Sequence, residues 1–270
     1  MVNPSDAVIV ATARSPIGRA VKGSLRDLRP DDLTATIVRA ALDKVPQLDP
    51  RDIDDLYLGC GLPGGEQGFN MARVVAVLLG YDHLPGATVT RYCSSSLQTT
   101  RMAFHAIKAG EGDVFISAGV EMVSRYSRGN SDSLPPEAQE LVGEGWHNPI
   151  FAEARARSEK RAAGGAPTWT DPRESGELPD IYLAMGQTAE NLAQVYNVTR
   201  EEMDAFGVRS QNLAEKAIGD GFWAREITPV TLPDGTVVSA DDGPRPGVTM
   251  EGVAALKPVF RPDGRITAGN

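Results

Sequence analysis

The chain has 270 residues, of which 41% are hydrophobic, so it can bury the core of one large or two modest domains. Its 36 acidic residues outnumber its 27 basic ones and give a net charge of −9, which argues against nucleic acid as the main partner. Two cysteines are too few for a disulfide framework and lack the spacing of a zinc site. Neither a signal peptide nor an apolar run near the roughly 20 residues of a membrane span is found. We therefore expect a cytoplasmic protein with no metal and no membrane span.

The N-terminal part alternates short β-type runs with helical patterns. Strands are predicted at residues 7–13, 55–61, 87–92 and 113–121, and helices at 31–45, with Asp31 as N-cap, at 70–80 and at 94–110. Strands that alternate with helices pair in parallel through crossovers, which predicts a layered α/β domain. The helix over 94–110 is apolar on nearly all sides, so we expect it to lie inside the protein.

From residue 124 the chain becomes rich in Gly, Pro, Ser and charged residues, which predicts a long loop-like insertion. Inside it, Thr199 and Glu202 form a capping-box pattern ahead of a helix that runs to about Gly219. A hairpin is predicted at 230–238. An insertion of this length in a compact fold is usually functional.

Cys93 stands in "VTRYCSSSLQTTRMAF" (89–104), between a β-favouring run and a helix-favouring one. A free thiol has a pKa of about 8.5, but at a helix N-terminus, which carries about half a positive charge, the value falls to roughly 3.5 to 7.5. The small residues after Cys93 would let a substrate carbonyl approach the sulfur. The pattern alone leaves two interpretations open, a nucleophile and a packed core cysteine.

The other reactive side chains are weaker candidates. Cys60 follows a predicted strand between two glycines, so we expect it to be packed. His105 lies well inside the helix over 94–110, which favours a core or interface imidazole over a catalytic base. His83 and His147 are expected in loops.

Several segments together resemble the thiolase family over essentially the whole chain. "VTRYCSSSLQ" resembles the stretch around the acyl-accepting cysteine of thiolases, "AGVEMVSR" (118–125) the stretch that follows it, and "MGQTAENLA" (185–193) the coenzyme A loop region. The segments at 208–230 and 245–270 follow in the family's order and spacing. Two positions depart from the family pattern: Ser96 stands where many members have Gly, and Ala184 where some have His.

The resemblance implies a layered αβαβα fold and an acetyl-CoA C-acyltransferase. Its domains would be a nucleophile-bearing α/β domain at 1–123, an inserted coenzyme A-binding loop domain at 124–248, and a return to the first domain at 249–270. A thiolase cleaves 3-oxoacyl-CoA, or condenses two acyl-CoA molecules, through an acyl-cysteine intermediate. Cys93 matches the catalytic position, and Met185 and Arg245 match positions near coenzyme A. From the residues alone, Met185 could equally fill a core and Arg245 could be a solvated loop charge.

The resemblance further implies coenzyme A or acyl-CoA as a substrate with no tightly bound cofactor, and a homo-oligomer, either a dimer or a tetramer. The family's second half, with a Gly-His-Pro histidine and a Cys-x-Gly cysteine, has no counterpart in the 270 residues. Thiol activation and enolate protonation need an acid and a base from that half, so we expect this chain to be catalytically incomplete. A ketosynthase-type condensing enzyme and a non-catalytic acyl-CoA-binding or assembly module are the alternatives.

Overall fold

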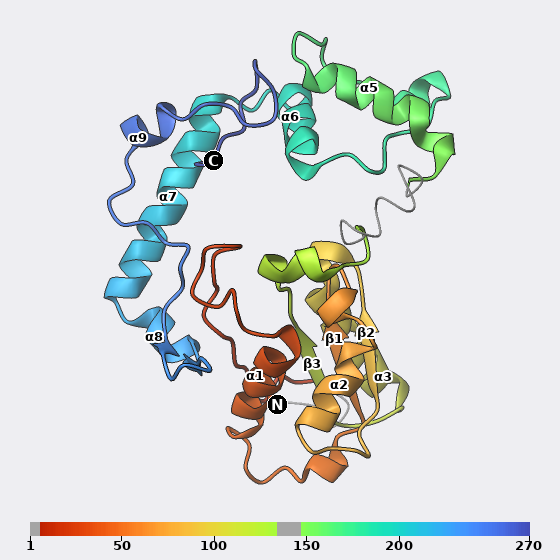
Figure 1. Cartoon of the computed structure of the whole chain (residues 1–270), viewed down its shortest axis with the longest axis vertical. Coiled ribbons are helices and arrows are strands. Elements are labelled where there is room, and N and C mark those ends of the chain that lie inside the picture. Colours follow the sequence, from red (N-terminus) through yellow and green to blue (C-terminus); the bar gives the residue numbers. More distant parts are fainter. Residues whose placement is uncertain (1–5, 134–146) are drawn as a thin grey trace. The chain divides into compact units, whose positions relative to one another are not determined.

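The computed structural model describes residues 6–133 and 147–270, which fall into two units (Figure 1). The first takes in the described residues of Met1–Leu141 together with Gly221–Gly243, and the second those of Val142–Asp220 with Pro244–Asn270. The elements of the first unit are α1 (Pro30–Leu42), β1 (Asp55–Gly59), α2 (Met71–Leu78), β2 (Gly86–Val89), α3 (Ser95–Ala109), β3 (Phe115–Gly119), α8 (Phe222–Glu226), β4 (Val230–Thr231) and β5 (Val237–Val238). Those of the second are α5 (Ala152–Ala162), α6 (Met185–Val195), α7 (Arg200–Gly219) and α9 (Met250–Ala254).

A parallel sheet in the order β2-β1-β3 forms the centre of the first unit. Leu56 and Leu58 of β1 are fully buried on one face, in a core shared with α1 and α2. Gly59 lies on the opposite face, because successive side chains of a strand alternate, and the start of α3 packs against it. Helices thus cover both faces of the sheet, which confirms the predicted α/β layering. The hairpin at 230–238 is also confirmed, as β4 and β5.

The prediction of a strand at residues 7–13 is wrong. Val8, Ile9 and Val10 are 57%, 77% and 73% exposed, and no described residue pairs with them as a neighbouring strand. A β-prone run needs a partner for its backbone groups, and this segment finds only one isolated bridge near its end, between Arg14 and Ile227. Local preference is not enough here, because pairing is a tertiary property.

The N-cap of the first helix also differs from the prediction. Arg29 occupies the N-cap and Pro30 the first helical position. A backbone N–H at that position has no acceptor within the helix, so proline, which lacks one, fits there. Asp31 lies inside the first turn, and Arg29 donates to both of its carboxylate oxygens at 3.0 and 2.8 Å. The carboxylate therefore stabilises the helix start as a first-turn acid and not as a cap.

The helix α3 is not enclosed as its composition predicts. Its buried residues are Ser95, Thr99 and Ala106, whereas Leu97 and Phe104 are 71% and 46% exposed. Only a narrow stripe of α3 packs on the sheet, near Gly59 of β1 and Ser117 and Gly119 of β3, and none of the described residues covers the rest.

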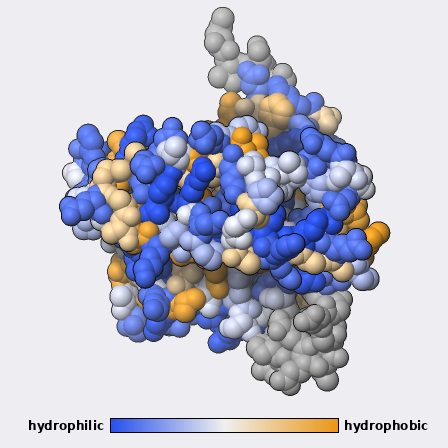
Figure 2. All heavy atoms as spheres, turned by 90° about the horizontal axis from the view of Figure 1, so that it is seen from above, coloured by the Kyte–Doolittle hydropathy of each residue, from blue (hydrophilic) through white to orange (hydrophobic). Residues whose placement is uncertain are grey.

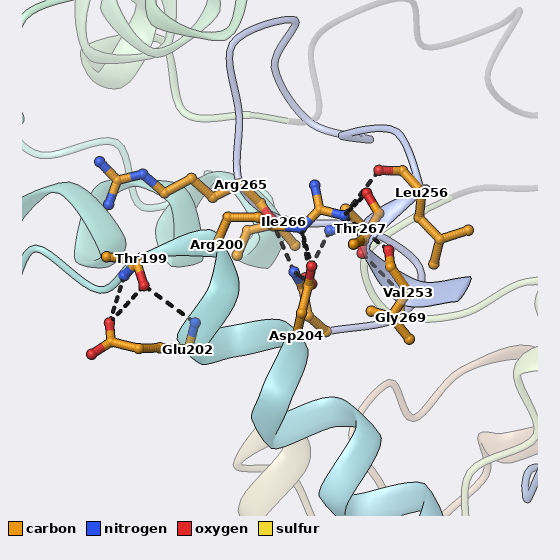
Figure 3. Close-up of polar contacts among 12 residues, drawn as sticks. Thr199, Arg200, Glu202, Asp204, Val253, Leu256, Arg265, Ile266, Thr267 and Gly269 are labelled. Atoms are coloured by element: carbon orange, nitrogen blue, oxygen red, sulfur yellow. Dashed lines mark hydrogen bonds and ion pairs between the residues drawn. The ribbon is translucent and has the colours of Figure 1, made fainter. Parts of the chain in front are cut away.

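The second unit contains more helix than the loop-like composition predicts. Both α5 and α6 lie in the part of the chain that was predicted to be a loop-like insertion. The predicted capping box is confirmed: Thr199 accepts from the backbone N–H of Glu202, whose carboxylate accepts from the backbone N–H of Thr199. Figure 3 shows this box and, beside it, Arg200 facing Asp204. Arg200 pairs with Asp204 at 2.8 Å and also donates to the carbonyls of Val253 and Leu256, which ties α7 to the end of α9.

The buried face of α6 is polar. The buried Glu190 carboxylate accepts from the backbone N–H groups of Arg265 and Ile266, and the buried Arg261 guanidinium donates to Gln187 and Asn191. These bonds hold the C-terminal segment on α6. On the face of the whole chain drawn in Figure 2, hydrophobic residues are scattered among hydrophilic ones.

Candidate active site

The chemistry-bearing residues of the first unit gather at the carboxyl edge of its sheet. Cys60 and Gly61 follow β1, Cys93 follows β2 after three residues, and Glu121 follows β3. Because the three strands are parallel, these ends meet at one edge, where open α/β sheets bind ligands. The topology therefore brings residues from three separate parts of the sequence to one place.

Cys93 lies in a 3-10 turn, Tyr92–Ser94, that runs directly into α3. Strand β2 ends at Val89, three residues earlier than predicted. Tyr92 has a φ of 45°, a left-handed conformation that is costly for a residue with a side chain. The buried Ser95 holds the turn, since its hydroxyl accepts from the backbone N–H of Arg91 at 2.9 Å and donates to the carbonyl of Tyr92 at 2.6 Å.

This geometry suits a nucleophile. Cys93 is exposed, and its thiol makes no hydrogen bond within the part of the chain that the structure describes. It immediately precedes the N-terminus of a 15-residue helix, whose unpaired N–H groups favour negative charge. The structure thus places Cys93 in a strand-to-helix turn, as predicted, with its side chain exposed, and the role of nucleophile stays a prediction.

Two glycines allow α3 to begin so close to the sheet. A Cβ on Gly59 would lie 2.6 Å from the backbone of Ser95, and a Cβ on Gly119 would lie 3.0 Å from the Cβ of Ser96. The fully buried Thr99 lies one turn further along and hydrogen-bonds to Ser117 of β3 at 3.0 Å. The start of the helix, and with it Cys93, is therefore seated on β1 and β3.

Cys60 is packed, as predicted. Its side chain is 1% exposed, and burial, assisted by the negative charge of Glu121, raises the pKa of its thiol to about 12. Its sulfur lies 3.8 Å from a carboxylate oxygen of Glu121. Such a thiol stays protonated at neutral pH and is unsuited to nucleophilic attack.

The histidines lie away from Cys93 or in the other unit. His105 is exposed, so of its two predicted settings the core is wrong and the interface stays a prediction. It stands ten residues along α3 from Ser95, a rise of about 15 Å. His83 precedes β2, at the opposite end of the strand from Cys93, and its ring lies 3.1 Å from the carbonyl of Pro50. His147 packs beside Tyr182 in the second unit. No histidine of the first unit is thus placed as a base for Cys93.

The predicted coenzyme A residues both belong to the second unit. Met185 is the first residue of α6 and is 75% exposed, so it is not a core filler. Arg245 is exposed, and its guanidinium makes no ion pair within the described ranges, while its backbone N–H donates to Gln211 at 2.9 Å. Both side chains are free to meet a ligand.

The cluster around Glu121 was not singled out from sequence. Its carboxylate accepts from the backbone N–H of Gly61 at 2.5 Å and from the side chains of Gln67 and Tyr126 at 2.9 and 2.8 Å. The only signal was its presence in the "AGVEMVSR" stretch. Over residues 6–133 and 147–270 the structure shows neither a metal-ligating group of three or more His, Cys, Asp or Glu nor a helix long and apolar enough to cross a membrane.

Comparison with known proteins identifies the family. Residues 7–270 match the family model "Thiolase, N-terminal domain". The chain is 38% identical to the beta-ketoadipyl-CoA thiolase of Pseudomonas knackmussii and 36% identical to the 3-ketoacyl-CoA thiolase of Bacillus subtilis, in each case over 98% of this chain and 62% of the relative. It thus spans less than two thirds of the length of these relatives.

Solved structures agree. The acetyl-CoA acetyltransferase of Bacillus anthracis superposes with a TM-score of 0.74 at 31% identity, covering 97% of this chain and 61% of that one. The dimeric peroxisomal thiolase of Saccharomyces cerevisiae gives 0.78 at 28% identity, covering 100% and 62%. The fold is that of the thiolase N-terminal domain, and the chain belongs to the thiolase family.

Proposed function

We propose that the protein is a thiolase-type acyltransferase that cleaves 3-oxoacyl-CoA, or runs the reverse condensation, with Cys93 as the nucleophile. The observation that carries this proposal is the exposed Cys93 in the turn that enters α3. The relatives named above are thiolases and an acetyl-CoA acetyltransferase, which supports the same reaction class.

In the proposed cleavage, the Cys93 thiolate attacks the 3-keto carbon of the substrate. The bond between carbons 2 and 3 breaks, and acetyl-CoA leaves as an enolate that takes up a proton. The shortened acyl group remains on Cys93 as a thioester. The thiolate of a second coenzyme A then attacks this thioester, which releases the new acyl-CoA and restores the thiolate of Cys93.

We further propose that the second unit binds coenzyme A through Met185 and Arg245. A guanidinium pairs strongly with phosphate, and a flexible thioether packs on apolar parts of a ligand. Replacing Arg245 with Gln should raise the KM for coenzyme A with little change in kcat, because the lost ion pair is remote from the reacting atoms. An unchanged KM would remove Arg245 from the site.

The test of the proposed nucleophile uses the protein expressed from its whole coding sequence. Incubation with a 3-oxoacyl-CoA and analysis by peptide mass spectrometry should show an acyl group on Cys93. The Cys93→Ser variant should lose it, whereas the matched Cys60→Ser variant should keep it. Coenzyme A binding without any acyl-Cys93 would favour the non-catalytic acyl-CoA-binding module instead.

The proposed assembly is a homodimer in the cytoplasm. The yeast structure named above is described as dimeric, and light scattering of the purified protein would test the number of chains. A monomer at working concentration would contradict this part of the proposal.

A further inference from the structure

We infer that Glu121 is a positioning residue for Cys93, fixing through its carboxylate the backbone on which the nucleophile turn rests. This inference deepens the proposed function of Cys93 and rests on it. Glu121 follows β3, and Cys93 follows β2, so neither sequence distance nor local pattern connects them.

Four donor groups converge on the Glu121 carboxylate. One oxygen accepts from the backbone N–H of Gly61, and the other accepts from the Gln67 amide and the Tyr126 hydroxyl and lies 3.8 Å from the Cys60 sulfur. Burial, followed by this hydrogen bond, raises the pKa of Tyr126, so its hydroxyl remains a donor across the neutral range. A carboxylate is suited to this place because it only accepts and can satisfy several donors at once.

Gly61 connects this carboxylate to the Cys93 turn. Its carbonyl accepts from the Thr90 hydroxyl at 2.7 Å, on the segment that leads into the turn. A Cβ on Gly61 would lie 2.6 Å from the Glu121 carboxylate and 3.5 Å from the backbone carbonyl carbon of Tyr92. The Gly61 backbone therefore lies close to both the Glu121 carboxylate and Tyr92, the residue with the strained φ of 45° directly before Cys93.

A strained conformation persists only where its surroundings fix it. The Ser95 hydroxyl fixes the turn from the helix side, and the Glu121–Gly61 pair supports it from the sheet side. If the hydrogen bond between Glu121 and Gly61 is lost, the turn at Tyr92 can relax, and the Cys93 sulfur then changes position. A displacement of 1 Å can reduce the rate of a reaction by about 10²-fold.

The experiment compares Glu121→Gln with Glu111→Gln in the protein expressed from its whole coding sequence. Glu111 is an exposed carboxylate just beyond the other end of α3, so the control removes an equal charge from the same unit. For Glu121→Gln we expect acyl transfer to Cys93 to slow by about 10-fold or more, with little change in the KM for acyl-CoA. Glu111→Gln should behave as wild type.

The rate at which iodoacetamide alkylates Cys93 distinguishes a positioning role of Glu121 from a purely electrostatic effect of its charge. Removing a nearby negative charge favours a thiolate and would speed alkylation, whereas a relaxed turn draws the sulfur away from the helix N-terminus and slows it. We expect slower alkylation in Glu121→Gln. Tyr126→Phe, which keeps the charge and removes one donor, should show a smaller loss in the same direction, and it serves as the second variant if Glu121→Gln does not fold.

The outcomes separate this inference from the proposed function. A wild-type protein that forms no acyl-Cys93 refutes the function, and the alkylation rates then decide the positioning role alone. An acylated wild type whose Glu121→Gln and Tyr126→Phe variants transfer and alkylate at wild-type rates overturns the inference. So does faster alkylation in Glu121→Gln, because that result assigns the carboxylate an electrostatic effect only.

Discussion

The two cysteines differ in reactivity because their surroundings differ. Cys93 is exposed before a helix N-terminus, and Cys60 is buried beside a carboxylate with the pKa of its thiol raised to about 12. We predict that at pH 8 iodoacetamide modifies Cys93 at least about 10²-fold faster than Cys60, since only about one Cys60 in 10⁴ is a thiolate at that pH. Peptide mapping over time measures both rates in one sample. Equal rates would contradict the assignment of Cys93 as the reactive thiol.

At the scale of single residues, sequence reveals a site only where its signal is local. Cys93 could be predicted because the β-type run, the small residues and the following helix are adjacent in the chain. The role of Glu121 could not, because Gly61 and Tyr92, which connect it to Cys93, come from the ends of two other strands. Such a cluster exists only once the parallel strand order is known.

The seating of α3 on the sheet gives a prediction for a whole element. In Gly59→Ala the new methyl group would lie 2.6 Å from the backbone of Ser95 and Ser96. Backbone atoms cannot relieve such a clash by changing rotamer, as a side chain could. We predict a loss of about 1–3 kcal/mol in the free energy of unfolding, and a changed rate of Cys93 alkylation as α3 shifts. Urea unfolding measures the first. Gly243→Ala, where nothing lies within 4 Å, is the control and should leave both unchanged.

Three ion pairs meet at Glu66 and should give a pH-dependent stability. Its carboxylate pairs with Arg125, with Arg128 at 3.0 Å and with Arg29 at 3.3 Å. The hydrogen bond from Arg125 is the main cause that lowers the pKa of Glu66. The charged form therefore stabilises the fold above the unfolded-state pKa of about 4.3, and this contribution disappears as the pH falls through the lower folded-state pKa.

We accordingly predict that Glu66→Gln is less stable than wild type at pH 7, by on the order of 1–3 kcal/mol, and that the difference shrinks as the pH falls below about 4. Urea unfolding at a series of pH values measures it. The control is Asp27→Asn, whose carboxylate is 84% exposed and pairs with Arg26, and which should change little because exposed pairs contribute little. A difference for Glu66→Gln that does not vary with pH would refute the role of its charge.

Elements were predictable where local and tertiary preferences agree. The capping box at Thr199 and the core strand β1 follow from neighbouring residues, and both are confirmed. The run at 7–13 is strand-like by composition but lacks a partner strand, and α3 is apolar but packs on the sheet only by a narrow stripe. In both cases the structure depends on contacts with another part of the molecule, a partner strand for residues 7–13 and a packing surface for α3, which the local sequence does not specify.

For the whole molecule, the described residues form two units, and the buried residues of the two units differ in polarity. The first has an apolar core under a parallel sheet, and the second relies on buried polar groups such as Glu190, Asp204 and Arg261. Periodicity of apolar residues predicts the first kind of interior. It misses the second, because buried polar side chains such as Gln187, Glu190 and Asn191 resemble surface residues in sequence, and the segment of α6 was accordingly not predicted as a helix.

The last prediction concerns turnover by the 270-residue polypeptide alone. Thiolysis needs a base to ionise Cys93 and an acid to protonate the departing enolate, and each contributes about 10²- to 10⁴-fold. In the first unit, His105 lies about 15 Å along α3 and His83 at the opposite end of β2, so neither serves Cys93. We expect thiolysis of acetoacetyl-CoA, followed by loss of its ultraviolet absorbance, to be at least about 10²-fold slower than with the 3-ketoacyl-CoA thiolase of Bacillus subtilis as the reference enzyme. Folding of the 270-residue polypeptide is checked by circular dichroism. Comparable turnover by the two proteins would show that these 270 residues already hold the acid and the base.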